Sequence, residues 1–365
     1  EKAYDRSQVL CEGIDDSAKL IPALWLLATF RLGRSEHAEA DRLVARFQKL
    51  ARQLKDPALL TIAGFEVSPL YQGKFEQSRL LLERSAGNRD IKLQRHLAQR
   101  FGMAPALLAT SFLAHCLLLM GFPEQSERAD NQAFELIEQI NHPMTACYVI
   151  SRSCWMMMLK DDPNQLTIQS AKLYQVAHRH DFKNFEVAAK FFKNWLRLGQ
   201  KKDLGTTIDG MQKNIEVYYA TKTVLNRTAF LVHVAQACLK AGQIERGLDA
   251  IKESIALGEQ TSELWYQAEA WRIQGELLLP ELDPQQGSEN EETAQACFVK
   301  AYEIAQEQKA KLWELRAAMS LAKLNRSQGK SNEGRKILEE TYQWFTEGFE
   351  IHDLQQAKRL LQTLQ

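Results

Sequence analysis

Apolar residues recur at helical spacing along most of the chain. Apolar side chains three, four, seven and eight positions apart share one face of an α-helix. Two such sets are Phe230, Val234, Ala237, Cys238 and, after a short break, Leu248, Ile251, Ile255, Ala256. The 365 residues include only 9 prolines and 18 glycines, so helix breakers are scarce. The pattern predicts an all-α protein.

Short turns separate the predicted helices at regular intervals. Most contain a glycine, which can adopt the left-handed conformation that ends a helix. The turn positions are Gly33, Gly73, Gly121, Asp161-Asp162-Pro163, Gly199, Gly242, the polar insertion 280–292 and Gly329. Gly33 and Gly329 are 296 residues and seven steps apart, a mean spacing of about 42 residues. A period of this length is typical of stacked helix hairpins.

Small residues at fixed offsets from the turns identify the hairpin type. In tetratricopeptide repeats, small residues on helix A and helix B let the two helices approach closely. Gly275 fits the helix-A position, and Ala294, Phe298 and Ala301 fit helix B. We therefore predict a right-handed α-α solenoid of about eight tetratricopeptide-like hairpins. It would form one domain over residues 1–365, with insertions near 85–105 and 280–292.

The C-terminal residues predict a capping helix. Helix B of the last hairpin should end near Gly348, and Asp353 with Gln356 has the spacing of a capping box. Ala357, Leu360, Leu361 and Leu364 then form one apolar stripe. A final helix of this kind covers the open end of a solenoid.

Charge and composition limit the classes of partner. The 46 basic and 46 acidic side chains cancel, which leaves no electrostatic footprint for nucleic acid or an anionic membrane. The most apolar run, residues 106–120, is 15 residues long, whereas a membrane span needs about 20. Six cysteines without a CxxC pair favour a reducing compartment, so we expect a cytoplasmic protein.

Several segments resemble the C-terminal region of bacterial multidomain predicted ATPases. They are Trp313–Ala322, the turn at Gly329, Tyr342–Phe349, Ala270–Leu279 and, less closely, Ala237–Gly242 and Ala114–Ser126. In that family a class III adenylate/guanylate cyclase domain or a DNA-binding domain precedes a P-loop signalling ATPase, and a long tetratricopeptide-like region follows. The resemblance implies a regulatory helical array. With Glu1 in place of a methionine, it leads us to expect a piece cut from a longer chain.

Motifs for catalysis or cofactor binding are missing from the sequence. Gly329-Lys330-Ser331 lacks the first glycine of a P-loop, since Leu324 holds that place and no strand precedes it. His178 and His180 are two residues apart and face different sides of a helix. We therefore expect no catalytic residue, no metal site and no cofactor in this chain, although the full-length protein could be an ATPase or a cyclase.

Helix-A side chains line the concave surface of stacked hairpins, and they supply our candidate partner-binding residues. The candidates are Glu186, Lys193, Gln236, Glu269, Arg272, Glu276, Arg316, Lys323 and Arg326. The alternative is an ordinary charged helix surface. A second candidate is the basic segment 84–100, with Arg89, Lys92, Arg95 and Arg100. It would contact an acidic partner or the upstream ATPase domain, and its alternative is a solvated loop and short helix.

These observations lead to two functional hypotheses. In the first, a protein or peptide binds in the superhelical groove and regulates an upstream ATPase or nucleotide cyclase. In the second, the array senses a small effector, as in ATPase-type transcriptional activators. An open charged channel would favour the first hypothesis, and an enclosed aromatic pocket of several hundred Å³ would favour the second. Self-association stays open.

Overall fold

The computed structural model describes residue 6 and residues 17–199, 203–279 and 287–364. Throughout these ranges the chain forms α-helices joined by turns, and no strand occurs in them. Consecutive helices pack against each other as antiparallel pairs from one end to the other. The predicted all-α solenoid of hairpins is therefore confirmed.

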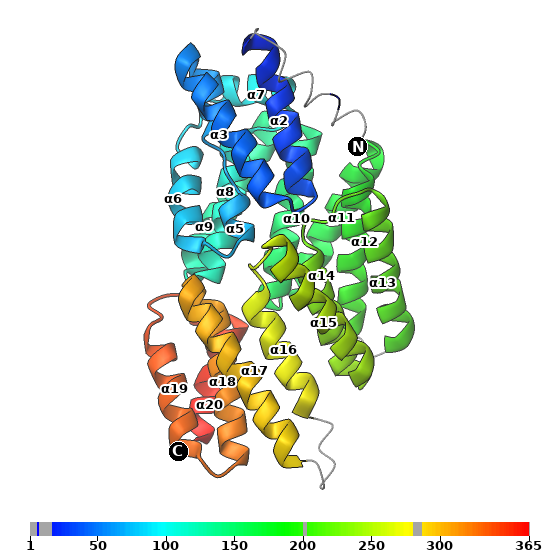
Figure 1. Cartoon of the computed structure of the whole chain (residues 1–365), viewed down its shortest axis with the longest axis vertical. Helices are drawn as coiled ribbons and strands as arrows, with labels where there is room; N and C mark the ends of the chain where they lie inside the picture. The colour runs from blue at the N-terminus through cyan, green and yellow to red at the C-terminus, as the bar shows by residue number, and fades with distance from the viewer. Residues whose placement is uncertain (1–5, 7–16, 200–202, 280–286, 365) are drawn as a thin grey trace.

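The hairpins wind from α2 and α3 near one end of the long axis to α19 and α20 at the other (Figure 1). The pairs are α2 (Ser17–Gly33) with α3 (His37–Leu54), α5 (Ser68–Tyr71) with α6 (Phe75–Ala86), α8 (Pro105–Leu119) with α9 (Pro123–Ile140), α10 (Pro143–Lys160) with α11 (Pro163–Arg179), α12 (Lys183–Leu198) with α13 (Leu204–Ala220), α14 (Arg227–Ala241) with α15 (Ile244–Thr261), α16 (Gln267–Leu278) with α17 (Gly287–Gln308) and α18 (Lys311–Ser327) with α19 (Ser331–Gln343). Helices α4 (Pro57–Ala63) and α7 (Ile91–Phe101) are additional, and α20 (His352–Thr363) comes last.

The two helices of a hairpin differ in composition because they differ in burial. Helix α8 (sequence PALLATSFLAHCLLL) is buried around almost its whole circumference, since it packs against α6, α9 and α10. Its partner α9 is amphipathic and buries only one side. A helix that is apolar all round belongs in a protein interior or a membrane. Here the neighbouring hairpins provide the interior.

Most predicted turns have the expected geometry. Gly73, Gly121, Gly242 and Gly329 all have positive φ angles. At the turn without glycine, Asp161 adopts the left-handed conformation and Asp162 accepts a hydrogen bond from the Gln165 amide. The first turn differs, because Gly33 is the last residue of α2 and Ser35 has the positive φ of 57°. Of the predicted insertion 280–292, residues 280–286 lie outside the described part, and α17 begins at Gly287.

The terminal helix is present, but its predicted start is wrong. Helix α19 ends at Gln343, before Gly348, and α20 begins at His352 without a side-chain cap. Asp353 lies inside α20 and binds Arg316 instead of a backbone amide. The apolar stripe is confirmed, since Ala357, Leu360 and Leu364 are buried in the last core cluster.

The solenoid curls tightly enough for distant hairpins to touch. The amides of Val224 and Leu225, in the α13–α14 loop, both donate to the carbonyl of Gly33 at the end of α2, at 2.7 and 3.0 Å. The amides of Leu264 and Trp265 likewise donate to the carbonyl of Tyr71. These contacts join residues about 190 positions apart. They close the superhelix over its own interior.

No single helix in the described ranges is long and apolar enough to span a bilayer. Helices α7 and α8 reach the required length only together, and they meet at an angle of 94°.

Candidate functional site

A cavity of about 290 Å³ lies inside the N-terminal part of the closed superhelix. Helices α2, α3, α8, α10 and α12 and the residues that lead into and out of the α13–α14 loop contribute its wall. We call residues 221–226 the closing loop, because their contact with Gly33 closes the superhelix. The cavity therefore lies where the first hairpin meets the closing loop.

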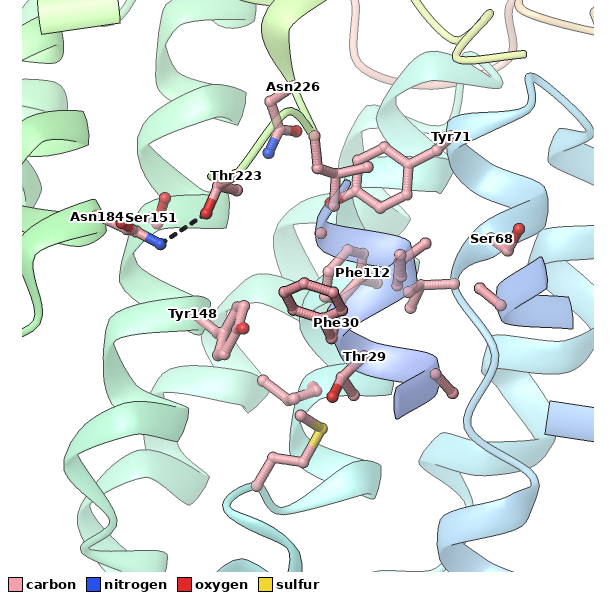
Figure 2. A pocket seen from close by; sticks show the side chains of 18 of the residues that line it. Thr29, Phe30, Ser68, Tyr71, Phe112, Tyr148, Ser151, Asn184, Thr223 and Asn226 are labelled. Carbon is pink, nitrogen blue, oxygen red and sulfur yellow. Dashed lines mark hydrogen bonds between the residues drawn. The ribbon is translucent and has the colours of Figure 1, made fainter. Parts of the chain in front are cut away.

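Aromatic side chains form much of the cavity wall. Phe30 from α2 and Phe112 from α8 lie near its centre, between Tyr148 and Tyr71 (Figure 2). Further rings come from Trp25, Phe65, Trp155, Phe185, Tyr218 and Phe230. Tyr71 contacts Phe112 edge to face, with 6.3 Å between ring centroids. The phenylalanine and tryptophan rings present apolar surface to a ligand, and the tyrosines add hydrogen-bonding hydroxyl groups.

One strongly basic side chain, Arg152 of α10, is buried in this wall with 5% of its surface exposed. Its Nη2 donates to the Tyr71 hydroxyl at 2.6 Å, and its guanidinium lies 4.4 Å from the centroid of Phe112. Its Nη1 is buried without a hydrogen-bond partner. None of the carboxylates in the described ranges forms an ion pair with it. Burial, together with the charge of Arg152, lowers the pKa of nearby His115 well below its usual value, so His115 is neutral at neutral pH.

The closing loop carries polar groups to the cavity. Asn184 Nδ2 of α12 donates to Thr223 Oγ1 at 2.9 Å, which ties the loop to α12 (Figure 2). Asn226 lines the same cavity, and its Oδ1 is buried without a partner. Lys222 and, from α3, Asp41 also contribute to the wall but are exposed. Charge in the wall is thus found at these exposed positions, at the half-buried Glu66 and, through Arg152, in the buried part.

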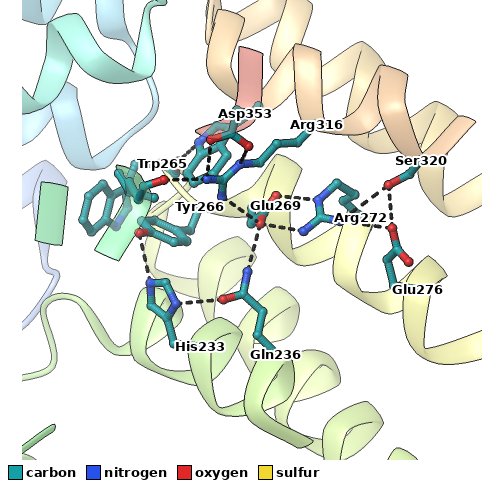
Figure 3. Close-up of polar contacts among 12 residues, drawn as sticks. His233, Gln236, Trp265, Tyr266, Glu269, Arg272, Glu276, Arg316, Ser320 and Asp353 are labelled. Atoms are coloured by element: carbon teal, nitrogen blue, oxygen red, sulfur yellow. Dashed lines mark hydrogen bonds and ion pairs between the residues drawn. The ribbon is translucent and has the colours of Figure 1, made fainter. Parts of the chain in front are cut away.

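Five of the predicted groove residues meet in one polar network further along the interior (Figure 3). Glu269 accepts hydrogen bonds from Gln236, Arg272 and Arg316, at 2.9, 2.7 and 3.3 Å. Arg272 also donates to Glu276 at 3.2 Å. The network therefore spans α14, α16 and α18, and its charged groups already have partners within the chain.

Glu269 is only 1% exposed, and its ionisation is set by these partners. Burial opposes ionisation, but the guanidinium groups of Arg272 and Arg316 hold the pKa of Glu269 below its ordinary value. Arg316 extends the network to α20 and α10, because it also donates to Asp353 and to the carbonyl of Leu159. The arrangement joins five helices, α10, α14, α16, α18 and α20, around charges that already have partners.

The remaining predicted groove residues lie apart from this network. Glu186 is buried and bonds to His178 and Lys183. Lys193, Lys323 and Arg326 are exposed, and Arg326 donates to Thr363 at the end of α20. A role for any of the nine residues in partner binding stays a prediction.

The basic segment 84–100 comprises the last residues of α6, the turn that follows and most of the additional helix α7. Arg89, Lys92, Arg95 and Arg100 are all exposed. Arg95 donates to the carbonyl of Gln139 at the end of α9, at 2.6 Å and 3.0 Å. Asp90 caps α7 by accepting from the Lys92 and Leu93 amides. The segment is thus a docked helix with an exposed basic side, and its binding role stays a prediction.

Across residues 17–199, 203–279 and 287–364, no three His, Cys, Asp or Glu side chains come close enough to hold a metal ion. Cys116, Cys147, Cys154, Cys238 and Cys297 are buried free thiols, and burial raises the pKa of Cys116 to about 12. Thiols in this state are poor nucleophiles. Gly329-Lys330-Ser331 is the turn between α18 and α19.

The cavity residues were not predicted from the sequence, although one of them carried a visible signal. Arg152 is the only charged side chain in the interior of α10, whose sequence is PMTACYVISRSCWMMMLK. A lone arginine within such an apolar helix indicates a buried charge with a specific partner. The aromatic residues gave no signal, because they come from helices that meet only in the folded superhelix.

Comparison with known proteins yields one curated relative and a shared fold. No family model matches the chain. An uncharacterized protein of Rhizobium meliloti (strain 1021) is 24% identical over 212 residues, which make up 58% of this chain and 20% of that protein. The chain therefore spans about one fifth of the length of that relative.

Two solved structures resemble the whole chain. Yeast Tom70 matches with a TM-score of 0.50 and 11% identity, over 100% of this chain and 85% of that chain. A Signal Transduction ATPase with Numerous Domains protein with a tetratricopeptide repeat sensor, from Pyrococcus horikoshii, matches with a TM-score of 0.49 and 14% identity, over 97% of this chain and 50% of that chain. The likeness to Tom70 supports the tetratricopeptide-like α-solenoid fold.

Proposed function

We propose that the chain is the effector-sensing repeat domain of a larger signalling protein and that the effector binds in the interior cavity. The observation that carries this proposal is the aromatic cavity of about 290 Å³ at the junction of the first hairpin and the closing loop. Small-molecule sites are concave, mostly apolar and supplied with a few polar groups. The cavity has each of these properties.

The state of the groove residues supports a small effector over a peptide as the ligand of the interior. Glu269 already forms ion pairs with both Arg272 and Arg316. A peptide that used these charges would have to break existing ion pairs in a buried setting, which is unfavourable. A ligand in the cavity would instead meet polar atoms that lack partners, on Arg152 and Asn226.

The position of the cavity suggests how occupancy would be transmitted. A bound ligand would touch α2 and the closing loop at the same time, and these two segments close the superhelix through Gly33. A ligand shifts a conformational equilibrium by its difference in affinity for the two states. Occupancy would therefore stabilise the closed superhelix over a more open one. We further propose that this change regulates a signalling ATPase or nucleotide cyclase upstream in the same cytoplasmic polypeptide.

The proposal is tested by filling the cavity. Thr29 lies on the cavity side of α2, whereas Leu26 on the same helix is 54% exposed and does not line the cavity. A metabolite collection is screened by thermal shift against the native chain, Thr29→Trp and the matched control Leu26→Trp. We expect ligands that raise the melting temperature of the native chain and of Leu26→Trp but not of Thr29→Trp. Ligands that stabilise all three proteins equally would contradict the cavity as the sensor site.

Partner binding is the second candidate, and the exposed cations favour it. Lys193, Lys323 and Arg326 are exposed, as are the basic residues of α7. An acidic protein segment, or the upstream ATPase domain itself, would complement them. Pull-down with the native chain, Lys323→Glu and Arg95→Glu tests this candidate. Capture that is undiminished by both changes would contradict it.

A further inference from the structure

We infer that the cavity takes a compact organic carboxylate, with its anionic group on Arg152 and its apolar body between the aromatic walls. This inference rests on the proposed sensor function and specifies the ligand class of the same cavity. It is carried by the unpaired donors of Arg152 and by the rings that surround them.

Arg152 is a buried cation that lacks an anionic partner. It is 5% exposed, and its Nη1 has no hydrogen-bond partner. Its recorded contacts are with neutral groups, namely the hydroxyl and ring of Tyr71 and the rings of Phe112 and Trp265. Arginine carries five N–H donors and stays charged in proteins. Because an uncompensated buried charge is strongly unfavourable, an anion delivered by a ligand would find a prepared site here.

The geometry of the donors favours a carboxylate. A guanidinium group presents parallel N–H bonds that match the two oxygens of a carboxylate. Tyr71 accepts from Arg152 Nη2 through its hydroxyl oxygen, which leaves its own O–H proton free to be donated. One carboxylate could thus receive hydrogen bonds from Arg152 Nη1 and from Tyr71.

Size and polarity define the rest of the ligand. A cavity of about 290 Å³ lies at the lower end of the range for small-molecule sites, so the body must be compact. Phe30, Phe112 and Tyr148 offer it ring faces and edges. The unpaired Oδ1 of Asn226 would accept from an N–H or O–H group on that body. An aromatic carboxylate with one such donor meets all of these conditions.

The test compares carboxylates with their neutral amides. The probes are indole-3-acetate with indole-3-acetamide, and octanoate with octanamide, titrated calorimetrically into the native chain. Arg152→Met removes the positive charge. Arg152→Lys keeps the charge but lacks the planar guanidinium group with its paired N–H donors. Arg128→Met is the matched control, because Arg128 is exposed and lies outside the cavity. Circular dichroism and thermal melting establish that each variant is folded.

We expect indole-3-acetate to bind the native chain at least about tenfold more tightly than its amide, as a charge-assisted hydrogen bond predicts. The preference should vanish in Arg152→Met, fall in Arg152→Lys and persist in Arg128→Met. If amides bind as tightly as acids, or if Arg152→Met keeps the preference, the carboxylate inference is overturned while the cavity sensor stands. If none of the four probes binds, the carboxylate inference is overturned, and the cavity sensor is decided separately by the thermal-shift screen with Thr29→Trp.

Discussion

Arg316 donates two parallel hydrogen bonds to Asp353, from Nε to Oδ1 at 2.8 Å and from Nη2 to Oδ2 at 2.9 Å. Their side chains are 15% and 7% exposed, so the pair is largely shielded from water. The same arginine donates to Glu269 on α16 and to the carbonyl of Leu159 on α10. The terminal helix is thus fastened to the superhelix interior by charge as well as by apolar packing.

We predict that Asp353→Asn lowers the free energy of unfolding by about 2–3 kcal/mol, because breaking a buried ion pair leaves one charge poorly compensated. Glu269 limits the loss, since it still pairs with Arg316. Urea denaturation measures the change. The exposed pair Arg335–Glu339 is the control, and Glu339→Gln should cost less than about 0.5 kcal/mol. An Asp353→Asn variant as stable as the native chain would show that the pair is energetically neutral.

The close approach of α16 and α17 depends on Gly275. A methyl group there would lie 2.5 Å from Phe298 Cε1, and Phe298 is fully buried. Gly275→Ala should therefore cost a net amount of about 1–2 kcal/mol, because overpacking outweighs the better helix propensity of alanine. Gly205→Ala is the matched control, since its nearest neighbour is Gln243 Nε2 at 3.7 Å. Thermal melting should show the control unchanged or more stable, and a stabilising Gly275→Ala would contradict the packing argument.

The fold was predictable because its signals are local. Gly275 was predicted at the helix-A position and Phe298 at a helix-B position from their offsets to the turns, and the structure brings these two residues together. Turn residues such as Gly242 and Asp161 could be identified in the same way, since a helix end depends on a few neighbouring residues. The period of the hairpins follows from these turns.

The site was not predictable from such signals. The contact of Gly33 with Val224 depends on the curvature accumulated over five hairpins, which no local pattern encodes. The cavity exists only because of that closure. Asp353 was mispredicted for the same reason. Its local spacing fits a helix cap, but the partner that it binds, Arg316, is distant in the sequence. A cap contributes about 1 kcal/mol, and the distant guanidinium of Arg316 offers a stronger charge-assisted partner.

Acid should destabilise the protein through its buried histidines. Burial lowers the pKa of His233 to about 4, from 6.5 in the unfolded chain, and the pKa of His37 likewise falls to about 4. Between pH 4 and 6.5 the unfolded state binds more protons than the folded state. The free energy of unfolding is therefore undiminished by these histidines above pH 6.5 and falls as the pH drops toward 4. At pH 5, His233 alone should lower the free energy of unfolding by about 2 kcal/mol.

The measurement compares urea denaturation of the native chain and of His233→Gln at pH 8, 7 and 5. Gln lacks a titrating group and can still bond to Gln236 and Tyr266, the present partners of His233. The fall in stability from pH 7 to 5 should be about 2 kcal/mol smaller in the variant. The interval from pH 8 to 7 is the internal control, because His233 is neutral in both states there. Equal losses in both proteins at pH 5 would contradict the assignment.

Asp130 should act in the opposite direction. Burial raises the pKa of Asp130 to about 6. The hydrogen bond that its Oδ2 accepts from Ser153 lowers the pKa but does not outweigh burial, and its Oδ1 has no partner. Between pH 3.8 and 6 the folded state binds the proton that the unfolded state has lost, so this contribution falls as pH rises. Above pH 7 the buried carboxylate is ionised in both states. It then costs the folded protein about 2–3 kcal/mol relative to a neutral group.

Asp130→Asn should therefore raise the free energy of unfolding by about 2 kcal/mol at pH 7.5, and the gain should shrink as the pH approaches 4. The amide preserves the size of the side chain and an acceptor for Ser153. Ser153→Ala is the companion variant, since it removes the hydroxyl without changing charge and should not reproduce this pH dependence. If Asp130→Asn is less stable than the native chain at pH 7.5, contacts around the carboxylate favour its charge, and the burial argument fails.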